Sequence, residues 1–185
     1  IEVNKKEILK EETGQISRQV DEKKIAFIVC QRKAERLYKR LFQSINTLIV
    51  PDGYSVEGVV VKYKNGIAAA YNEGMKQSNA KYKVYIDETA EIIHPNFIVE
   101  TLAQFSVVPN AGILGMIGSI LPSNGKLNQA LKIWGRYHQR KNEKIIDHLF
   151  KNPLLYNQNV QVIDRLLMVT SVDKIWDETF PDFFY

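Results

Sequence analysis

The chain has 185 residues, of which 45% are hydrophobic and 25% charged, which is ordinary for a folded protein with an apolar core. The longest apolar run, Ala111–Leu121, is too short to cross a bilayer, and the first residues lack the basic and then apolar pattern of a signal peptide. Because export and membrane signals are lacking, we expect a cytoplasmic protein without a transmembrane segment. A single cysteine, Cys30, excludes an internal disulfide and fits a reducing compartment.

The first third of the chain alternates between polar and apolar segments. Residues 1–24 hold six basic and six acidic side chains with a thin apolar stripe, which predicts a charged helical extension. Ile25–Cys30 is a continuous apolar run typical of a strand buried on both faces. Apolar residues at helical spacing predict a helix over Lys33–Thr47; the turn Pro51–Gly53 follows, and Val56–Val61 predicts a second buried strand.

The middle of the chain continues this alternation. We expect a helix over Ala68–Ser78, a strand over Tyr82–Ile86, a helix with Pro95 in its first turn, and a buried strand over Gly112–Gly118. Strands that alternate with helices in this way predict an α/β fold, with a doubly wound, mainly parallel sheet flanked by helices.

The last third is harder to assign. Leu121–Lys144 is rich in turn residues at its start and then predicts a helix. Val160–Thr170 predicts a long apolar strand, interrupted by Asp164 and Arg165. No repeat or second domain is evident, so we expect one domain over residues 25–185.

The positive charge is concentrated in one later segment. The net charge is +4, and Lys126–Lys144 contains six basic residues against the acidic Glu143. The simpler interpretation is a solvated helix or loop, and the alternative is a basic lip over an anionic substrate. Nucleic acid is not expected as a partner, because no base-reading motif accompanies the charge.

Two carboxylates, Asp87 and Glu88, directly follow the strand predicted over Tyr82–Ile86. In an open α/β sheet, ligands bind beyond the carboxyl ends of the strands. An acidic pair at that point can hold a divalent metal against a phosphate. The alternative is a solvated strand end without a ligand.

Four motifs follow one another in a fixed order around this strand end. They are the apolar strand that ends before Arg32, the small-residue segment Ile67–Gly74 (IAAAYNEG), the sequence DET at residues 87–89, and the spacer Ile92–Ile98 that leads into a helix. Over about residues 24–185, this order resembles the GT-A-fold enzymes of glycosyltransferase family 2. Within that family the chain is similar to a small bacterial subgroup of streptomycin-biosynthesis glycosyltransferase-like proteins.

The resemblance implies transfer of a sugar, with inversion, from a nucleotide-diphosphate donor, a UDP-sugar. The acceptor would be a saccharide, a lipid-linked saccharide or a protein. A divalent metal, Mn²⁺ or Mg²⁺, would join Asp87 and Glu88 to the diphosphate. The residues that the resemblance assigns to nucleotide-sugar binding are Cys30, Arg32, Asn72, Gly74, Asp87 and Glu88.

The sequence departs from the family pattern in the acidic motif. Thr89 replaces the second aspartate of Asp-x-Asp, and a neutral hydroxyl is a poorer metal ligand than a carboxylate. We therefore expect weak, substrate-dependent metal binding, with Glu88 or Glu91 compensating, or with Asp87 sufficient alone. Arg165 is a second departure, because related enzymes often have glycine there.

The sequence does not identify the catalytic base. The resemblance places the base just after an aromatic pair, and we expect it beyond Tyr185. The nearest carboxylates are Glu178 and Asp182, and Asp164 is a weaker candidate. Because Asp164 interrupts an apolar strand, its side chain should face a cleft or pair with Arg165.

Two other functions stay open at this point. Thr89, Arg165 and the missing base favour a catalytically degenerate domain that binds a nucleotide or a protein partner. A nucleotidyltransferase on a related fold would need a Gly-rich loop after the first strand, and residues 30–33 contain no glycine. Turnover of a nucleotide sugar would separate an enzyme from a binding module.

Other chemistries find no support in the sequence. A thiol inside a strand, such as Cys30, is usually inert. His94, His138 and His148 lack the spacing of metal ligands, and we expect His94 to be a helix-entry residue. The sequence contains no Walker loop, Gly-rich dinucleotide motif or Gly-x-Ser-x-Gly elbow.

Overall fold

The computed structural model describes residues 19–108, 110–121, 132–150 and 157–179. Contacts divide the chain into two compact units, one of residues 1–113 with 169–185 and one of residues 114–168. The single domain expected over residues 25–185 stays a prediction. No helix within the described ranges is long and apolar enough to span a membrane.

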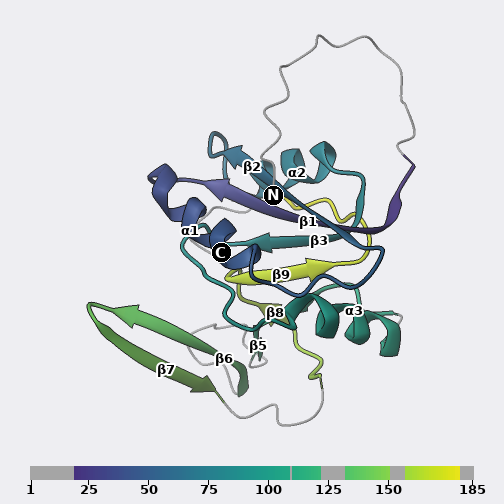
Figure 1. Cartoon of the computed structure of the whole chain (residues 1–185). Helices are drawn as coiled ribbons and strands as arrows, with labels where there is room; N and C mark the ends of the chain where they lie inside the picture. The colour runs from purple at the N-terminus through teal and green to yellow at the C-terminus, as the bar shows by residue number, and fades with distance from the viewer. Residues whose placement is uncertain (1–18, 109, 122–131, 151–156, 180–185) are drawn as a thin grey trace. The chain divides into compact units, whose positions relative to one another are not determined.

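The first unit is a layered α/β structure (Figure 1). In chain order its elements are β1 (Asp21–Gln31), α1 (Glu35–Ile45), β2 (Ser55–Lys62), α2 (Ile67–Gln77), β3 (Ala80–Ile86), α3 (Phe97–Val107) and the second half of β9 (Leu167–Thr170). β1 pairs in parallel with β2 on one side and with β3 on the other. The sheet order β2-β1-β3-β9 confirms the predicted α/β fold with its mainly parallel sheet.

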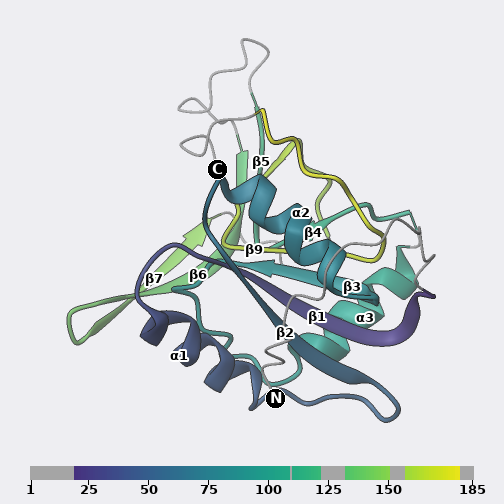
Figure 2. The same cartoon turned by 90° about the horizontal axis from the view of Figure 1, so that it is seen from above.

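Helices cover both faces of this sheet. Figure 2 shows α2 on one face, and α1 and α3 on the other. Ile28 contacts α2, whereas its neighbour Phe27 contacts Phe97 of α3, because successive side chains of a strand point to opposite faces. Five consecutive residues of β1, Ile25–Val29, are therefore at most 3% exposed. This two-sided burial explains the continuous apolar run in the sequence.

The N-terminal boundary of β1 differs from the prediction. Asp21 pairs with Ala80, and Lys24 pairs with Ser55, so Asp21–Lys24 belong to the strand and not to a helical extension. Residues 1–18 of the predicted extension lie outside the described residues. Pro95 precedes the N-cap of α3 instead of lying in its first turn.

The second unit is an antiparallel sheet of the order β7-β6-β5-β8. Its strands are β5 (Ile117–Ile120), β6 (Lys132–Lys141), β7 (Lys144–Phe150) and β8 (Val162–Ile163), and the two-residue strand β4 (Leu114–Gly115) precedes them. β6 and β7 form a long hairpin through a tight turn, in which Asn142 has a positive φ of 56°.

Three predictions for this part of the chain are wrong. Gly112–Gly118 is not one buried strand, but is divided between β4 and β5 and is mostly partly exposed. The helix expected late in Leu121–Lys144 is the strand β6. Val160–Thr170 is broken into β8 and β9, because Asp164 accepts a hydrogen bond from the backbone N–H of Leu166 at 2.7 Å and so stabilises a turn.

Candidate functional site

The acidic pair lies at the carboxyl end of β3, beside the end of β1. Val29 of β1 is in register with Ile86 of β3, so the residues that follow these two strands meet at one edge of the sheet. The arrowheads of β1 and β3 mark this edge in Figure 1. Arg32 follows β1, and Asp87 and Glu88 follow β3. The parallel topology therefore brings together three residues that the sequence predicts for the site.

Both carboxylate oxygens of Asp87 accept hydrogen bonds from the protein. Oδ2 accepts from Nη2 of Arg32 at 2.6 Å. Oδ1 accepts from the backbone N–H of Thr89 at 2.9 Å and from its hydroxyl at 2.6 Å. The backbone carbonyl of Asp87 also accepts from the N–H of Ala90, which closes a turn. Thr89, the departure from the family motif, thus acts as a donor that orients Asp87.

Glu88 is a buried carboxylate with a structural role. Its side chain has no exposed surface, and Oε2 accepts hydrogen bonds from the backbone N–H groups of Arg32 at 3.1 Å and Lys33 at 3.2 Å. Oε1 is buried without a hydrogen-bond partner, and Nε of Arg32 lies 3.9 Å away. A buried charge needs such partners, so Glu88 holds the loop after β1 against the end of β3.

This arrangement does not form a ready divalent-metal site. Three of the four carboxylate oxygens of Asp87 and Glu88 already accept hydrogen bonds from the chain. The described residues contain no group of three or more His, Cys, Asp or Glu side chains that could hold a metal ion. At such a site Mg²⁺ or Mn²⁺ is bound by one or two carboxylates together with phosphate and water oxygens, and those carboxylates must turn open lone pairs toward the metal. Metal binding by Asp87 and Glu88 therefore stays a prediction. The arrangement of these two side chains does not fit it.

Asn72 and Gly74 have clear packing roles on α2. The buried amide of Asn72 donates to the carbonyl of Trp176 at 2.9 Å and to Glu178 at 2.7 Å, and its oxygen accepts from the N–H of Trp176 at 2.8 Å. A Cβ at Gly74 would collide with Ile28, so glycine is required for α2 to approach the sheet. Contact of either residue with a nucleotide stays a prediction.

The remaining sequence candidates lie in different surroundings. Cys30 is buried near the end of β1. Asp164 is exposed in the turn between β8 and β9 and belongs to the second unit. His94 lies before α3 and contacts Glu100 at 2.8 Å, as expected for a helix-entry residue. Asp182 lies outside the described residues.

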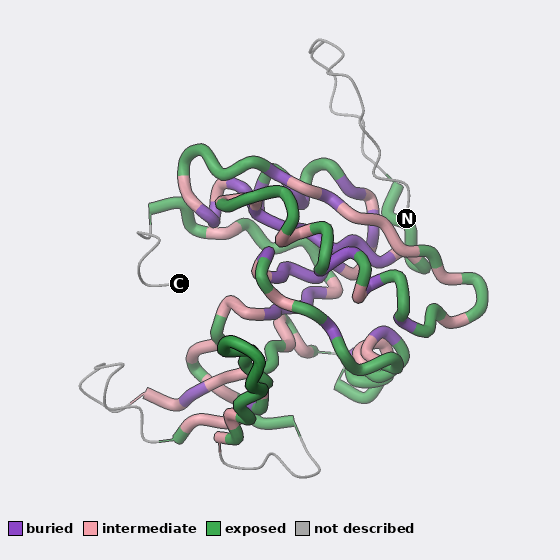
Figure 3. The backbone as a smooth tube through the Cα atoms, turned by 60° about the vertical axis from the view of Figure 1, so that its left-hand side comes forward, coloured by how far each residue is buried: buried purple, intermediate pink, exposed green. Residues whose placement is uncertain are grey.

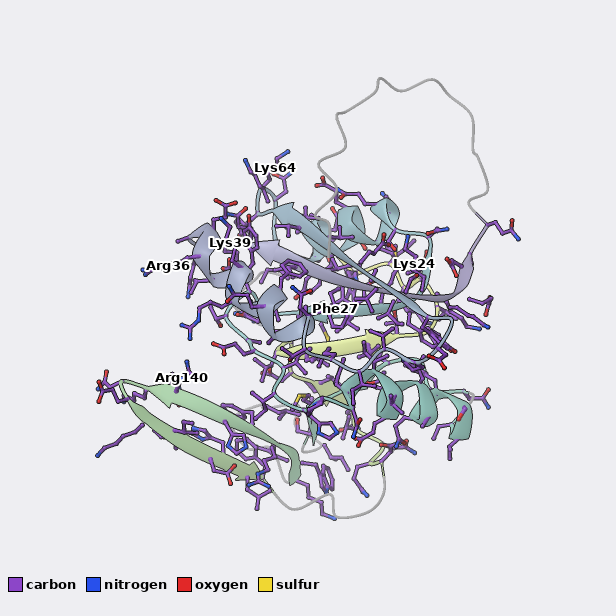
Figure 4. All side chains as sticks on the ribbon, viewed as in Figure 1. Lys24, Phe27, Arg36, Lys39, Lys64 and Arg140 are labelled. Atoms are coloured by element: carbon purple, nitrogen blue, oxygen red, sulfur yellow. The ribbon has the colours of Figure 1, made fainter. Side chains whose placement is uncertain are left out.

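A basic edge is the feature that sequence reasoning missed. Lys33 and Arg36 follow β1, and Lys62 and Lys64 end β2 or follow it; all four are exposed. Figure 4 shows Arg36 and Lys64 extending from the edge where the arrowheads of β1 and β2 lie. The signal in the sequence was the position of these cations directly after two parallel strands, and not their number.

The predicted basic segment is a different structure. Lys126 lies outside the described residues, and the other five cations lie on the β6–β7 hairpin of the second unit. Arg136 is paired with Asp147 across the hairpin at 2.8 Å. Over residues 132–144, the simpler interpretation, a solvated helix or loop, is correct about exposure and wrong about secondary structure.

A second buried polar cluster lies beneath α2. The rings of Tyr71, Tyr85 and Trp176 pack together, with centroids 4.9–5.7 Å apart. The Tyr85 hydroxyl, the Thr170 hydroxyl and the indole N–H of Trp176 are buried without a hydrogen bond of acceptable geometry among the described residues. Burial raises the pKa of Tyr85, and the proximity of Trp176 and Thr170 moderates this rise. The cluster anchors the segment after β9 to α2 and β3.

Comparison with known families agrees with this architecture. A family model described as a glycosyltransferase-like family matches residues 26–185. The chain belongs to this glycosyltransferase-like family. Among curated proteins, no relative matches the chain. Membership in the family supports a general glycosyltransferase function, with a nucleotide-sugar donor and an acceptor. The bacterial subgroup named from the sequence stays a prediction.

Proposed function

We propose that the chain transfers a sugar from a nucleoside-diphosphate donor, a UDP-sugar, to an acceptor hydroxyl with inversion at the anomeric carbon. The observation that carries the proposal is the contact of Asp87 with Arg32 at the carboxyl edge of the sheet. Asp87 is 14% exposed and Arg32 is 25% exposed, so both side chains are held in place and still reach solvent. The family match over residues 26–185 includes the whole of this edge.

The proposed reaction makes two chemical demands on the protein. The acceptor oxygen bonds to the anomeric carbon while the bond from that carbon to the diphosphate breaks, and the hydroxyl proton passes to a base. Negative charge grows on the departing diphosphate and is stabilised by nearby cations. Arg32 and the basic edge of Lys33, Arg36, Lys62 and Lys64 meet the second demand. The base is not assigned to any described residue.

The alternative is a binding module that retains the fold without turnover. It is favoured by Thr89, which donates to Asp87 where the family pattern has a second carboxylate. In that case nucleoside diphosphates would bind at the same edge, and no sugar would be released from any donor.

A donor screen separates the two functions. Release of nucleoside diphosphate from UDP-, GDP-, ADP- and dTDP-sugars should be measured with Mn²⁺ present, with and without mixed saccharide acceptors. For an enzyme, we expect Asp87→Ala to lower the rate by about 100-fold or more, because it removes a group that orients the charge-stabilising cation. The control is Asp52→Ala, an exposed carboxylate in the turn before β2, which should leave the rate unchanged. Binding of a nucleoside diphosphate without turnover of any donor would favour the binding module. Absence of both binding and turnover would reject both proposed functions.

A further inference from the structure

Arg32 is fixed between the two carboxylates of the DET motif. Its Nη2 lies 2.6 Å from Oδ2 of Asp87, and its Nε lies 3.9 Å from Oε1 of Glu88. Its backbone N–H also donates to Oε2 of Glu88 at 3.1 Å. A guanidinium is planar and permanently charged, so it can face two carboxylates at once. Arg32 therefore places a fixed positive charge beside the Asp87 carboxylate, as a bound metal ion would.

Moving Arg32 away from Asp87 would be unfavourable because of Glu88. The Glu88 carboxylate is wholly buried, and its Oε1 has no hydrogen-bond partner among the described residues. If a metal displaced the guanidinium, this buried charge would lose its nearest cation. Removing one partner of a buried pair is strongly destabilising. The buried glutamate thus keeps Arg32 at the edge of the sheet and opposes a metal at Asp87.

A diphosphate can bind without this displacement. The hydrogen bond to Asp87 uses one of the five N–H donors of the guanidinium, and its remaining donors suit phosphate oxygens. Further positive charge is close in the chain, because Lys33, Arg36, Lys62 and Lys64 are exposed in the segments around the ends of β1 and β2. Figure 4 labels two of them, Arg36 and Lys64. Glu35 carries the carboxylate in these segments, and it forms an ion pair with Lys39.

We propose that Arg32 replaces the divalent cation of this site, so that the chain binds the pyrophosphate group of its donor without a metal. The inference rests on the proposed function and narrows it to a metal-independent enzyme. Asp87 is then a positioning residue for Arg32 and not a metal ligand. Glu88 is the buried counter-charge that holds Arg32 in place.

Calorimetric titration with inorganic pyrophosphate tests the inference without knowledge of the nucleobase. The titration is made in EDTA and again with Mn²⁺, and UDP is titrated in parallel. We expect pyrophosphate and UDP to bind in EDTA, with affinities within about threefold of those in Mn²⁺. Arg32→Met should weaken pyrophosphate binding by about 10- to 100-fold, because it removes a charged hydrogen-bond donor. The affinity of Arg32→Lys for pyrophosphate should lie between those of the wild type and Arg32→Met.

Asp87→Asn gives the sharpest distinction. If Arg32 is the cation, this variant releases the guanidinium from its ion pair with Asp87, while Glu88 still holds Arg32 at the edge. Pyrophosphate binding should then be unchanged or stronger in EDTA, even where the lost orientation of Arg32 slows turnover. If Asp87 is a metal ligand, the same variant should weaken binding in Mn²⁺. Arg40→Met is the matched control, because Arg40 is also an arginine paired with a carboxylate, Glu91, at 3.2 Å. It should leave pyrophosphate binding unchanged.

The outcomes separate this inference from the proposed function. Binding that requires Mn²⁺ and is weakened by Asp87→Asn would overturn the inference, while the proposed function would stand. Absence of pyrophosphate and UDP binding in every condition would overturn both. Because Arg32→Met leaves Glu88 without its cation, the double variant Arg32→Met/Glu88→Gln is measured as well, with thermal unfolding of each. A folded double variant that binds pyrophosphate like the wild type would also overturn the inference.

Discussion

The two units of the molecule are stabilised in different ways. Buried residues concentrate in the strands of the first unit, whereas residues of the second unit are mainly intermediate or exposed (Figure 3). Phe27 of β1 is wholly buried, while Ile145 of β7 is 69% exposed. The first unit is thus stabilised by an apolar core on both faces of its sheet. In the second, cross-strand pairs carry much of the stabilisation of the hairpin.

In the β6–β7 hairpin, cross-strand pairs of side chains take the place of an apolar core. Tyr137 stacks on His148 with a centroid distance of 4.5 Å and an interplanar angle of 7°. Arg136 and Asp147 form a two-point ion pair on the opposite face of the ribbon. Such pairs are individually weak and sensitive to pH and salt. The comparison teaches that the first unit gives the rigid edge a site needs, and that the hairpin should respond to solution conditions.

The two tryptophans allow each unit to be followed separately. Trp134 lies in the second unit and Trp176 in the first, and the chain contains no other tryptophan. Trp134→Phe therefore leaves a fluorescence signal from the first unit, and Trp176→Phe leaves one from the second. Denaturant unfolding of these two backgrounds would show whether the units unfold together.

The largest effect is expected from the core of the first unit. Phe27→Ala removes a ring that packs against Phe97, with centroids 6.3 Å apart, and should lower the free energy of unfolding by about 3–5 kcal/mol. The matched change in the hairpin, Ile145→Ala, should alter it by less than about 0.5 kcal/mol. Urea unfolding in the two single-tryptophan backgrounds measures both. Equal losses of unfolding free energy in the two variants would contradict the view that only the first unit depends on an apolar core.

A smaller effect is expected where α2 approaches the sheet. In Gly74→Ala the new methyl group would collide with Ile28, which is wholly buried and cannot move aside easily. Overpacking of this kind costs about 1–3 kcal/mol, partly offset by the better helix propensity of alanine, about 1 kcal/mol. We expect a net loss of stability in the transition reported by Trp176.

Gly112→Ala is the control for that variant. Gly112 is exposed, and nothing lies within 4 Å of a Cβ added there. The stability of Gly112→Ala should therefore match that of the wild type. A Gly74 variant as stable as this control would mean that Ile28 and α2 relax at little cost.

The difference between the units also decided what the sequence could predict. Ile25–Cys30 and Ile67–Gly74 carry strong signals, because a strand buried on both faces must be apolar and a helix close to a sheet needs small residues. The order of such segments was enough to predict the α/β fold and the edge that holds Asp87. The hairpin gave no comparable signal, since its strands are exposed on much of their surface and mix charges with Ile145 and Leu149.

The candidate site was predicted in position but not in detail. The sequence placed Arg32, Asp87 and Glu88 at one edge, which follows from parallel pairing alone. It did not distinguish the two carboxylates, because the burial of Glu88 depends on backbone N–H groups contributed by the loop after β1. Likewise, the contact of Thr89 with Asp87 depends on the turn geometry after β3, which a motif does not specify.

The smallest effect is expected from the ion pair of the hairpin. The Arg136 guanidinium, which donates to both oxygens of Asp147 at 3.0 and 2.8 Å, lowers the pKa of that carboxyl, and the nearby His138 and His148 contribute when charged. Because the pKa is lower in the folded state, the pair stabilises the hairpin above the ordinary aspartate pKa, and this contribution is lost as the pH falls through the folded value. Asp147→Asn should therefore lower the midpoint of the Trp134-reported transition at about pH 7, and match the wild type in acid well below both pKa values.

Salt distinguishes charge from packing in this last variant. The pair is exposed, so about 1 M salt should screen it and reduce the difference between Asp147→Asn and the wild type at neutral pH. The Trp176-reported transition of the first unit should not respond to the substitution if the units unfold independently. A difference that persists unchanged in acid and in high salt would show that the variant loses packing around Tyr137 and His148. The hairpin would then resemble the first unit more closely than its exposure suggests.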